Sequence, residues 1–151
     1  MSGVSITLSN FQPTLETAFR SLGLSPEQIN TANDRALTAM GAWMFREMRS
    51  ALEPTGAQGQ PGSNKKWKPL SEAWIALKAS EGRPTHIGIH EGMMQNSIST
   101  DKRLSQLQVE TGPTVEHAEG FDKVRPITPK EDYALSYMAE AMIDALGKVA
   151  R

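Results

Sequence analysis

The chain is 151 residues long, carries a formal net charge of −1 and contains no cysteine. This length suits one domain that can bury a core. The balanced charge excludes a broad cationic surface of the kind that drives non-specific nucleic-acid binding, and the lack of cysteine excludes disulfides, thiolate metal sites and a cysteine nucleophile. The start of the chain has no basic leader, and no apolar run approaches the roughly 20 residues that cross a bilayer, so we expect a soluble protein.

Two helices are expected in the N-terminal third of the chain. Over residues 11–22 apolar side chains recur at steps of three or four, which predicts a short amphipathic helix that ends at Gly23. A second, long helix follows, because Ser25 can cap it, Pro26 suits its first position and Gln28 is spaced to complete a capping box. Apolar residues then keep a helical step as far as Leu52, and we expect that face to be core.

The segment 53–66 is dominated by Gly, Pro and small polar residues and has no periodicity. Structureless connections longer than about 12–15 residues are uncommon inside compact domains. We therefore expect a flexible loop that is either disordered or ordered only by a partner. A segment of this kind loses entropy when it docks but can wrap a large surface.

Regular structure is expected to resume after Trp67. Ser71 can cap a short helix that runs through Leu77 and is closed by residues 81–84. A weaker helical piece is predicted over residues 93–98. The next segment, 104–111, alternates apolar and polar residues as a half-buried strand does.

The remaining elements complete the predicted fold. The segments 97–100, 115–118 and 123–127 are candidate neighbours of the strand in a small antiparallel sheet. Thr128 precedes Pro129 as a cap does, and the apolar residues that follow place one face on a C-terminal helix. The sequence thus predicts a single α+β domain over residues 1–151, in which a long N-terminal helix and a C-terminal helix pack on a small antiparallel sheet, with a flexible loop.

The three histidines do not form a recognisable metal site. His86 and His90 would align only on a helix, which Pro84 and Gly88 would break, and a third ligand such as His117 would have to come from elsewhere in the fold. Ordinary surface or packing histidines are the simpler interpretation, and we expect no metal. A metal enzyme or hydrolase built on these imidazoles remains a rival interpretation.

Other catalytic patterns are also missing from the sequence. Ser71 and Ser97 lie in capping or strand contexts without a Gly-x-Ser-x-Gly turn. The glycines at 56, 59 and 62 follow a helix rather than a strand, which does not suit a phosphate-binding loop. We therefore predict no catalytic residue, no cofactor and no enzymatic activity.

A short basic stretch supports an alternative function. Lys65, Lys66 and Lys68 surround Trp67, and this patch could serve a small nucleic-acid-binding or regulatory protein. Most of the cations are spread among acidic residues, so solvated surface charge is the simpler interpretation.

The order of motifs from about residue 67 to residue 146 resembles the phage virion-morphogenesis family. The matching pieces run in chain order: Trp67-Lys68-Pro69-Leu70-Ser71 followed by Lys78; Gly92-x-Met94-x-x-Ser97-Ile98; the strand Gln108-Val109-Glu110-Thr111-Gly112; His117-Ala118-Glu119-Gly120-Phe121, which looks like a His-x-x-Gly element; and Arg125-Pro126 ahead of the closing helix.

The resemblance implies a structural role in the virion. Members of this family are tail-completion or neck proteins that join the tail of a bacteriophage to its head. The expected partners are therefore further copies of this chain in a homo-oligomeric ring, six by analogy, together with tail-tube and head-tail connector proteins. DNA would pass through the lumen without specific binding, and no membrane is involved. The expected location is the neck or tail of the virion, after assembly in the host cytoplasm. Tail terminators and head-to-tail connectors share a similar small α+β plan.

Seven residues are candidates for contacts with another subunit or partner. Large aromatics contribute disproportionately at the buried centre of interfaces, although Trp67 and Trp74 could equally serve ordinary packing between helix and sheet. Pro69 is expected to fix the entry of the short helix, and His117 and Phe121 could instead be half-buried sheet residues. The full set is Trp67, Pro69, Leu70, Trp74, His117, Phe121 and Arg125.

Overall fold

The computed structural model describes residues 4–7, 22–53, 58–83, 85 and 93–150. The expected α+β class is confirmed. Most of the predicted first helix, residues 11–21, lies outside the described residues. The described elements, in chain order, are β1 (Val4–Thr7), α2 (Pro26–Leu52), α3 (Glu72–Ser80), α4 (Met93–Asn96), β2 (Ser99–Arg103), the 3₁₀ turn η2 (Leu104–Gln106), β3 (Gln108–Gly112), α5 (Ala118–Val124) and α6 (Glu131–Val149).

Helix α2 begins where the sequence predicts. The Ser25 hydroxyl accepts a hydrogen bond from the Gln28 backbone N–H at 3.2 Å, and the Gln28 side chain accepts one from the Ser25 N–H at 2.9 Å. This reciprocal pair satisfies two of the amide donors that every helix start leaves free. The predicted apolar stripe is buried along the length of α2.

The sheet has three antiparallel strands in the order β1-β3-β2. The segment 97–100 was a correct candidate in part, because β2 begins at Ser99. The candidates 115–118 and 123–127 were wrong as strands, since this part of the chain forms a turn, helix α5 and the connection to α6. The edge strand β1 instead comes from the N-terminus, where Val4 pairs with Thr111 and Thr7 with Gln108.

Helix α6 starts later than the sequence predicts. Its N-cap is Lys130, not Thr128. The Thr128 hydroxyl bonds the carboxylate of Asp122 instead, and one oxygen of that carboxylate also accepts from the backbone N–H groups of Ile127 and Thr128 at 2.8 and 3.1 Å. A contact with the preceding helix therefore outcompetes the local capping pattern, and it fixes the turn between α5 and α6.

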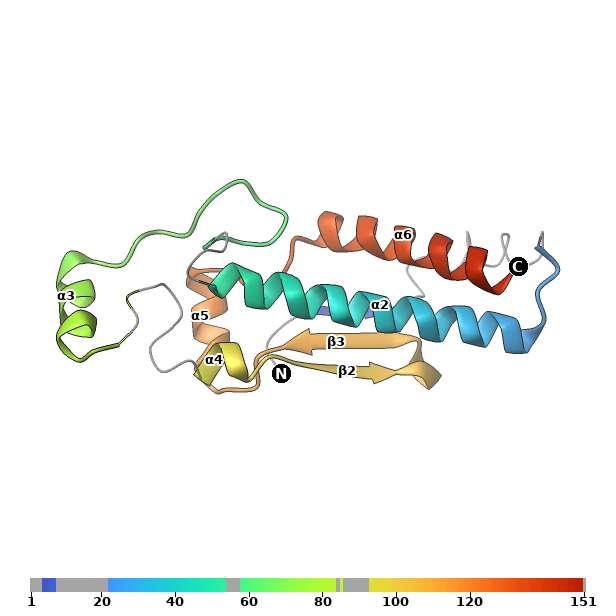
Figure 1. The fold of residues 1–151 in the computed structure, drawn as a ribbon, viewed down its shortest axis with the longest axis horizontal. Helices are drawn as coiled ribbons and strands as arrows, with labels where there is room; N and C mark the ends of the chain where they lie inside the picture. Colours follow the sequence, from blue (N-terminus) through green and yellow to red (C-terminus); the bar gives the residue numbers. More distant parts are fainter. Residues whose placement is uncertain (1–3, 8–21, 54–57, 84, 86–92, 151) are drawn as a thin grey trace.

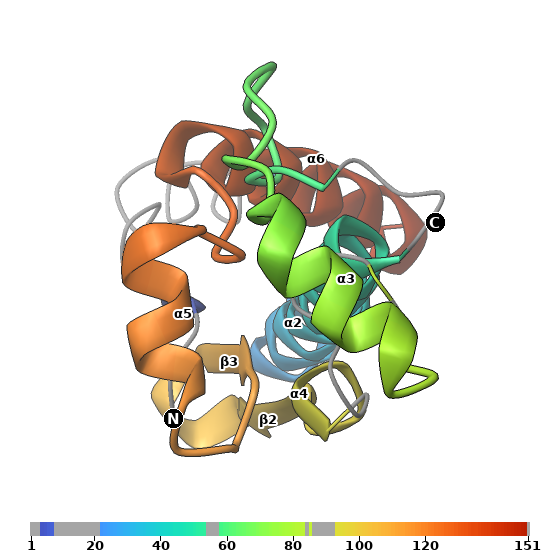
Figure 2. The ribbon, with the colours of Figure 1, turned by 90° about the vertical axis from the view of Figure 1, so that its left-hand side faces the viewer.

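Helix α2 lies between the sheet and α6 (Figures 1 and 2), and the core follows its two faces. Near the middle of the molecule Trp43 stacks on Tyr137 with ring centroids 4.6 Å apart and meets Tyr133 edge-on. Gly41 faces the sheet, where Thr100 and Val109 leave no room for a side chain. Methionine, alanine and leucine dominate one main cluster of buried side chains: Ala32, Ala36, Leu37, Met40, Trp43, Met44, Val109, Ala134, Met138, Met142, Ala145 and Leu146.

The described part of the expected loop, residues 58–66, is held by contacts within the chain. Gly59 and Lys66 form an antiparallel bridge that closes it. The Lys130 N–H donates to the Pro61 carbonyl at 3.0 Å, and the Gln60 side chain donates to the Thr128 carbonyl at 2.9 Å. The expectation that this segment is ordered only by a partner does not fit residues 58–66, because residues at the start of α6 form hydrogen bonds with it. These residues are distant in the chain, so the local sequence pattern of 58–66 could not reveal the contact.

Candidate interaction surface

Helix α3 lies at one end of the long axis, beyond the C-terminal end of α2 (Figure 1). It forms for a local reason, since the Ser71 hydroxyl accepts from the Trp74 N–H at 3.3 Å as predicted. It ends at Ser80, and Gly82, two residues later, has a φ of 67° that suits glycine. Among the described helices and strands, none packs closely against α3.

The apolar side chains of α3 face solvent. Trp74, Ile75 and Leu77 are 41%, 37% and 45% exposed. Single exposed apolar residues are common, but adjacent large ones on a projecting element are typical of an interaction surface. We call these three side chains the α3 apolar surface.

The one buried side chain of α3 is a lysine. Lys78 is 2% exposed, and the loss of hydration lowers the pKa of its amine. A helix of a monomeric domain ordinarily buries its apolar residues and exposes its lysines. Lys78 follows Trp74 by four residues and Ile75 by three, so it lies on the same side of α3 as they do, and both of these apolar side chains stay partly exposed.

The base of α3 is fixed to the body by three of the predicted site residues. Trp67 is only 7% exposed, its ring N–H donates to the Pro126 carbonyl at 2.9 Å, and Phe121 meets it edge-on at 5.8 Å. The Arg125 side chain donates to the Lys68 carbonyl at 3.2 Å. Trp67, Phe121 and Arg125 thus form an intramolecular anchor, so the packing role is the one that Trp67 performs in this structure.

The other predicted site residues are spread along the surface. Pro69 is exposed and Leu70 half-buried in the connection that leads to α3, and Trp74 lies on α3 itself. His117 is exposed at the N-terminal end of α5, far along the chain from α3. The lysines of the basic patch, Lys65, Lys66 and Lys68, are all exposed.

Sequence reasoning did not single out Ile75 and Leu77. A signal was present, because the stretch from Ala73 to Leu77 is apolar without interruption and so has no polar face. A helix that is apolar all round is buried either in its own chain or against another molecule.

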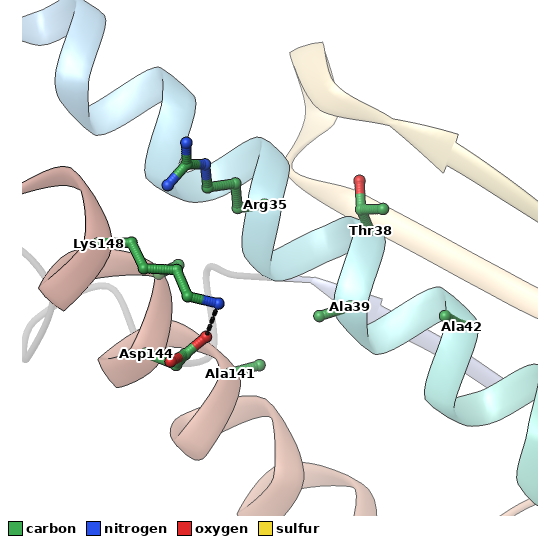
Figure 3. A pocket seen from close by; sticks show the side chains of 8 residues that line it. Arg35, Thr38, Ala39, Ala42, Ala141, Asp144 and Lys148 are labelled. Atoms are coloured by element: carbon green, nitrogen blue, oxygen red, sulfur yellow. Dashed lines mark ion pairs between the residues drawn. The ribbon is translucent and has the colours of Figure 1, made fainter.

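A second feature is an open groove of about 510 Å³ between α2 and α6, shown in Figure 3. Its centre is made of alanines from both helices, which leave the space between the two backbones unfilled. Charged residues stand at its rim, where Lys148 and Asp144 form an ion pair at 2.8 Å. The lining residues are Arg35, Thr38, Ala39, Ala42, Ala141, Asp144, Ala145 and Lys148. The sequence analysis did not predict the groove.

The histidines give no metal site within the described residues. His86 and His90 lie outside the described residues. Within the described ranges no group of three histidine, aspartate or glutamate side chains is arranged to hold a metal ion. None of the helices in those ranges combines the length and apolar character that a membrane span requires.

Comparison of the chain with protein-family models, with curated proteins and with solved structures found no match.

Proposed function

We propose that this chain is a structural neck protein of a tailed bacteriophage. Copies of it assemble into a ring that completes or terminates the tail and joins it to the head. The observation that carries the assembly part of the proposal is the α3 apolar surface, which is partly exposed at one end of the molecule and against which no described helix or strand packs closely. The resemblance in motif order from residue 67 to residue 146 supplies the virion context.

The physical argument concerns apolar area. Removing apolar surface from water stabilises an association by roughly 25 cal/mol per Å². A partly exposed tryptophan, isoleucine and leucine on one nine-residue helix therefore favour burial of their exposed area against a partner. A closed ring meets this demand in every subunit at once, because each copy both offers and receives the contact.

The base of α3 is suited to such a role. Trp67 and Arg125 tie the connection before α3 to the segment before α6. A fixed direction of α3 relative to α2 sets the angle between neighbouring subunits, and that angle sets the number of copies that close a ring. In this proposal the protein acts by shape, and DNA passes through the ring with little attraction because the net charge is near zero.

The direct test images the pure full-length protein by negative-stain electron microscopy and measures its mass by light scattering over a range of concentrations. Closed rings of uniform diameter are expected. In a phage or prophage that encodes the chain, disruption of the gene is expected to leave heads and tails unjoined. A protein that stays monomeric at every concentration, together with intact infectious particles from the disrupted phage, would refute the proposal.

The basic patch supports the alternative of nucleic-acid binding, because Lys65, Lys66 and Lys68 are all exposed. A binding assay on duplex and single-stranded DNA over a series of salt concentrations separates the two functions. Phosphate contacts by these lysines predict an affinity that falls steeply with salt. A neck subunit is expected to bind DNA weakly at every salt concentration.

A further inference from the structure

We propose that α3 of one copy docks head to tail in the α2–α6 groove of the next copy. This inference rests on the self-assembly proposed above and names its contact surfaces. The occupant of the groove is a second copy of this chain, and its recognition element is the α3 apolar surface.

The two surfaces complement each other in the size of their side chains. The groove is lined by Ala39, Ala42, Ala141 and Ala145, and these small residues leave about 510 Å³ open between two rigid helices. The α3 apolar surface carries large side chains that stand out from a narrow helix. Large residues inserted between small ones give the close packing that stable interfaces need.

The two surfaces also complement each other in charge. Glu72 lies in the first turn of α3, one turn before Ile75, and Arg35 lies at the rim of the groove, one turn before Ala39. Within the described residues neither Glu72 nor Arg35 has an ion-pair partner in its own chain. The two charges have opposite sign, so docking can pair them across the contact and set its orientation.

The groove lies well away from α3 along α2, so the contact must be between copies. Ala42, the groove residue nearest the C-terminal end of α2, stands 10 residues before Leu52, which is about 15 Å along the helix axis. Figure 1 shows α3 beyond that C-terminal end, whereas the groove residues belong to the middle turns of α2 and the C-terminal half of α6. A contact between two different and separate surfaces of the same chain repeats from copy to copy and closes as a ring when the rotation per copy allows.

Cross-linking of two single-cysteine variants tests the contact directly, because the natural chain has no cysteine to confuse the result. Ala73→Cys places a thiol on α3 one turn before Leu77, and Ala42→Cys places one in the groove; both alanines are exposed. The two full-length variants carry tags of different size and are mixed with a short bis-maleimide. The proposal expects a product that joins one Ala73→Cys chain to one Ala42→Cys chain.

The matched control replaces Ala42→Cys with Ser136→Cys, an exposed position of α6 outside the groove lining. Little mixed product is expected from that pair. Equal yields from the control and the groove pair would overturn the docking proposal, since they would reflect random collision.

Charge reversal tests the orientation of the contact. Glu72→Arg and Arg35→Glu are each expected to weaken self-association about ten-fold, as judged by sedimentation at several protein concentrations. The double variant is expected to recover most of the loss, which a folding defect would not do. Arg103→Glu, an exposed position on β2, on the opposite side of α2 from α6, is the matched control and is expected to associate like the natural protein.

The outcomes separate this contact from the proposed function. If the natural chain assembles but the mixed product and the recovery are both absent, the docking proposal is wrong and the ring function stands. If the natural chain does not assemble at any concentration, the docking proposal fails, and the particles from the disrupted phage then decide whether the neck function fails with it.

Discussion

At the scale of single residues, Gly41 explains how closely α2 approaches the sheet. A Cβ at this position would lie 2.6 Å from Cγ2 of Thr100 and 3.0 Å from Cγ2 of Val109. Alanine ordinarily favours a helix interior over glycine by about 1 kcal/mol. Here we expect the clash to prevail, so Gly41→Ala should lower the free energy of unfolding by about 1–3 kcal/mol, measured by urea denaturation.

Gly147 is the matched control for this substitution. It also lies in a helix, α6, but a Cβ there would have no neighbour within 4 Å. Gly147→Ala should therefore stabilise the protein by up to about 1 kcal/mol. A stabilising Gly41→Ala would show that the helix and sheet can separate at no cost, which contradicts the packing of this core.

Lys78 predicts a stability that depends on pH. Burial lowers the pKa of its amine from the ordinary value of 10.5. Between the lowered pKa and 10.5 the unfolded chain binds more protons at this site than the folded chain, so the free energy of unfolding should rise with pH across that window and level off above it. Denaturation of the natural protein and of Lys78→Met at a series of pH values measures this. The variant should lack the rise.

Tyr133 acts in the opposite direction over a neighbouring pH range. Burial, together with the charge of Glu47 and a hydrogen bond to it, raises the pKa of the Tyr133 phenol above 10.0. Its contribution to stability is present below pH 10.0 and is lost as the pH rises through the raised value. Tyr133→Phe, alone and combined with Lys78→Met, therefore separates the two effects. A rise with pH that survives in Lys78→Met would assign it to another group.

At the scale of elements, the contact of residues 58–66 with α6 depends on Gly62. Its φ is 84°, and a Cβ would lie 2.6 Å from three side-chain atoms of Tyr133. Gly62→Ala is expected to destabilise the protein by about 1–3 kcal/mol in thermal or urea unfolding, because it adds backbone strain and a clash with α6.

Gly82 separates those two costs. Its φ is 67°, but a Cβ there would have no neighbour within 4 Å, so Gly82→Ala carries the backbone cost alone, about 1–2 kcal/mol. Equal losses in Gly62→Ala and Gly82→Ala would mean that the loop does not need its contact with Tyr133.

The elements that the sequence predicted well are those with local causes. The starts of α2 and α3 depend on Ser25 and Ser71, whose hydroxyls cap amides three residues later. Strand β1 was missed because its partner is β3, more than 100 residues away in the chain, and four residues carry little periodic signal. The start of α6 was misplaced because Thr128 bonds Asp122 rather than its own helix.

The candidate surface was harder to predict than the fold. Trp74 attracted attention as a large aromatic, but whether a tryptophan packs inward, as Trp67 does, or outward depends on which elements cover it in space. The groove depends on two helices that bring Ala42 and Ala141 together from distant parts of the sequence. No pattern within either helix alone reveals that space.

At the scale of the whole molecule, the projecting helix α3 and the α2–α6 groove lie at different places along α2. Assembly should therefore depend on the α3 apolar surface and not on every exposed apolar side chain. Ile143 on α6 is 71% exposed, more than Leu77 at 45%. Leu77→Asp is expected to abolish assembly, because it places a charge in the surface that must lose its water, while Ile143→Asp leaves assembly unchanged. Both sites face solvent, so both variants should keep the melting temperature of the natural protein within a few degrees. Light scattering measures the assembly and circular dichroism the melting. Equal loss of assembly in the two variants would indicate general apolar adhesion, and loss in Ile143→Asp alone would move the contact from α3 to the outer face of α6.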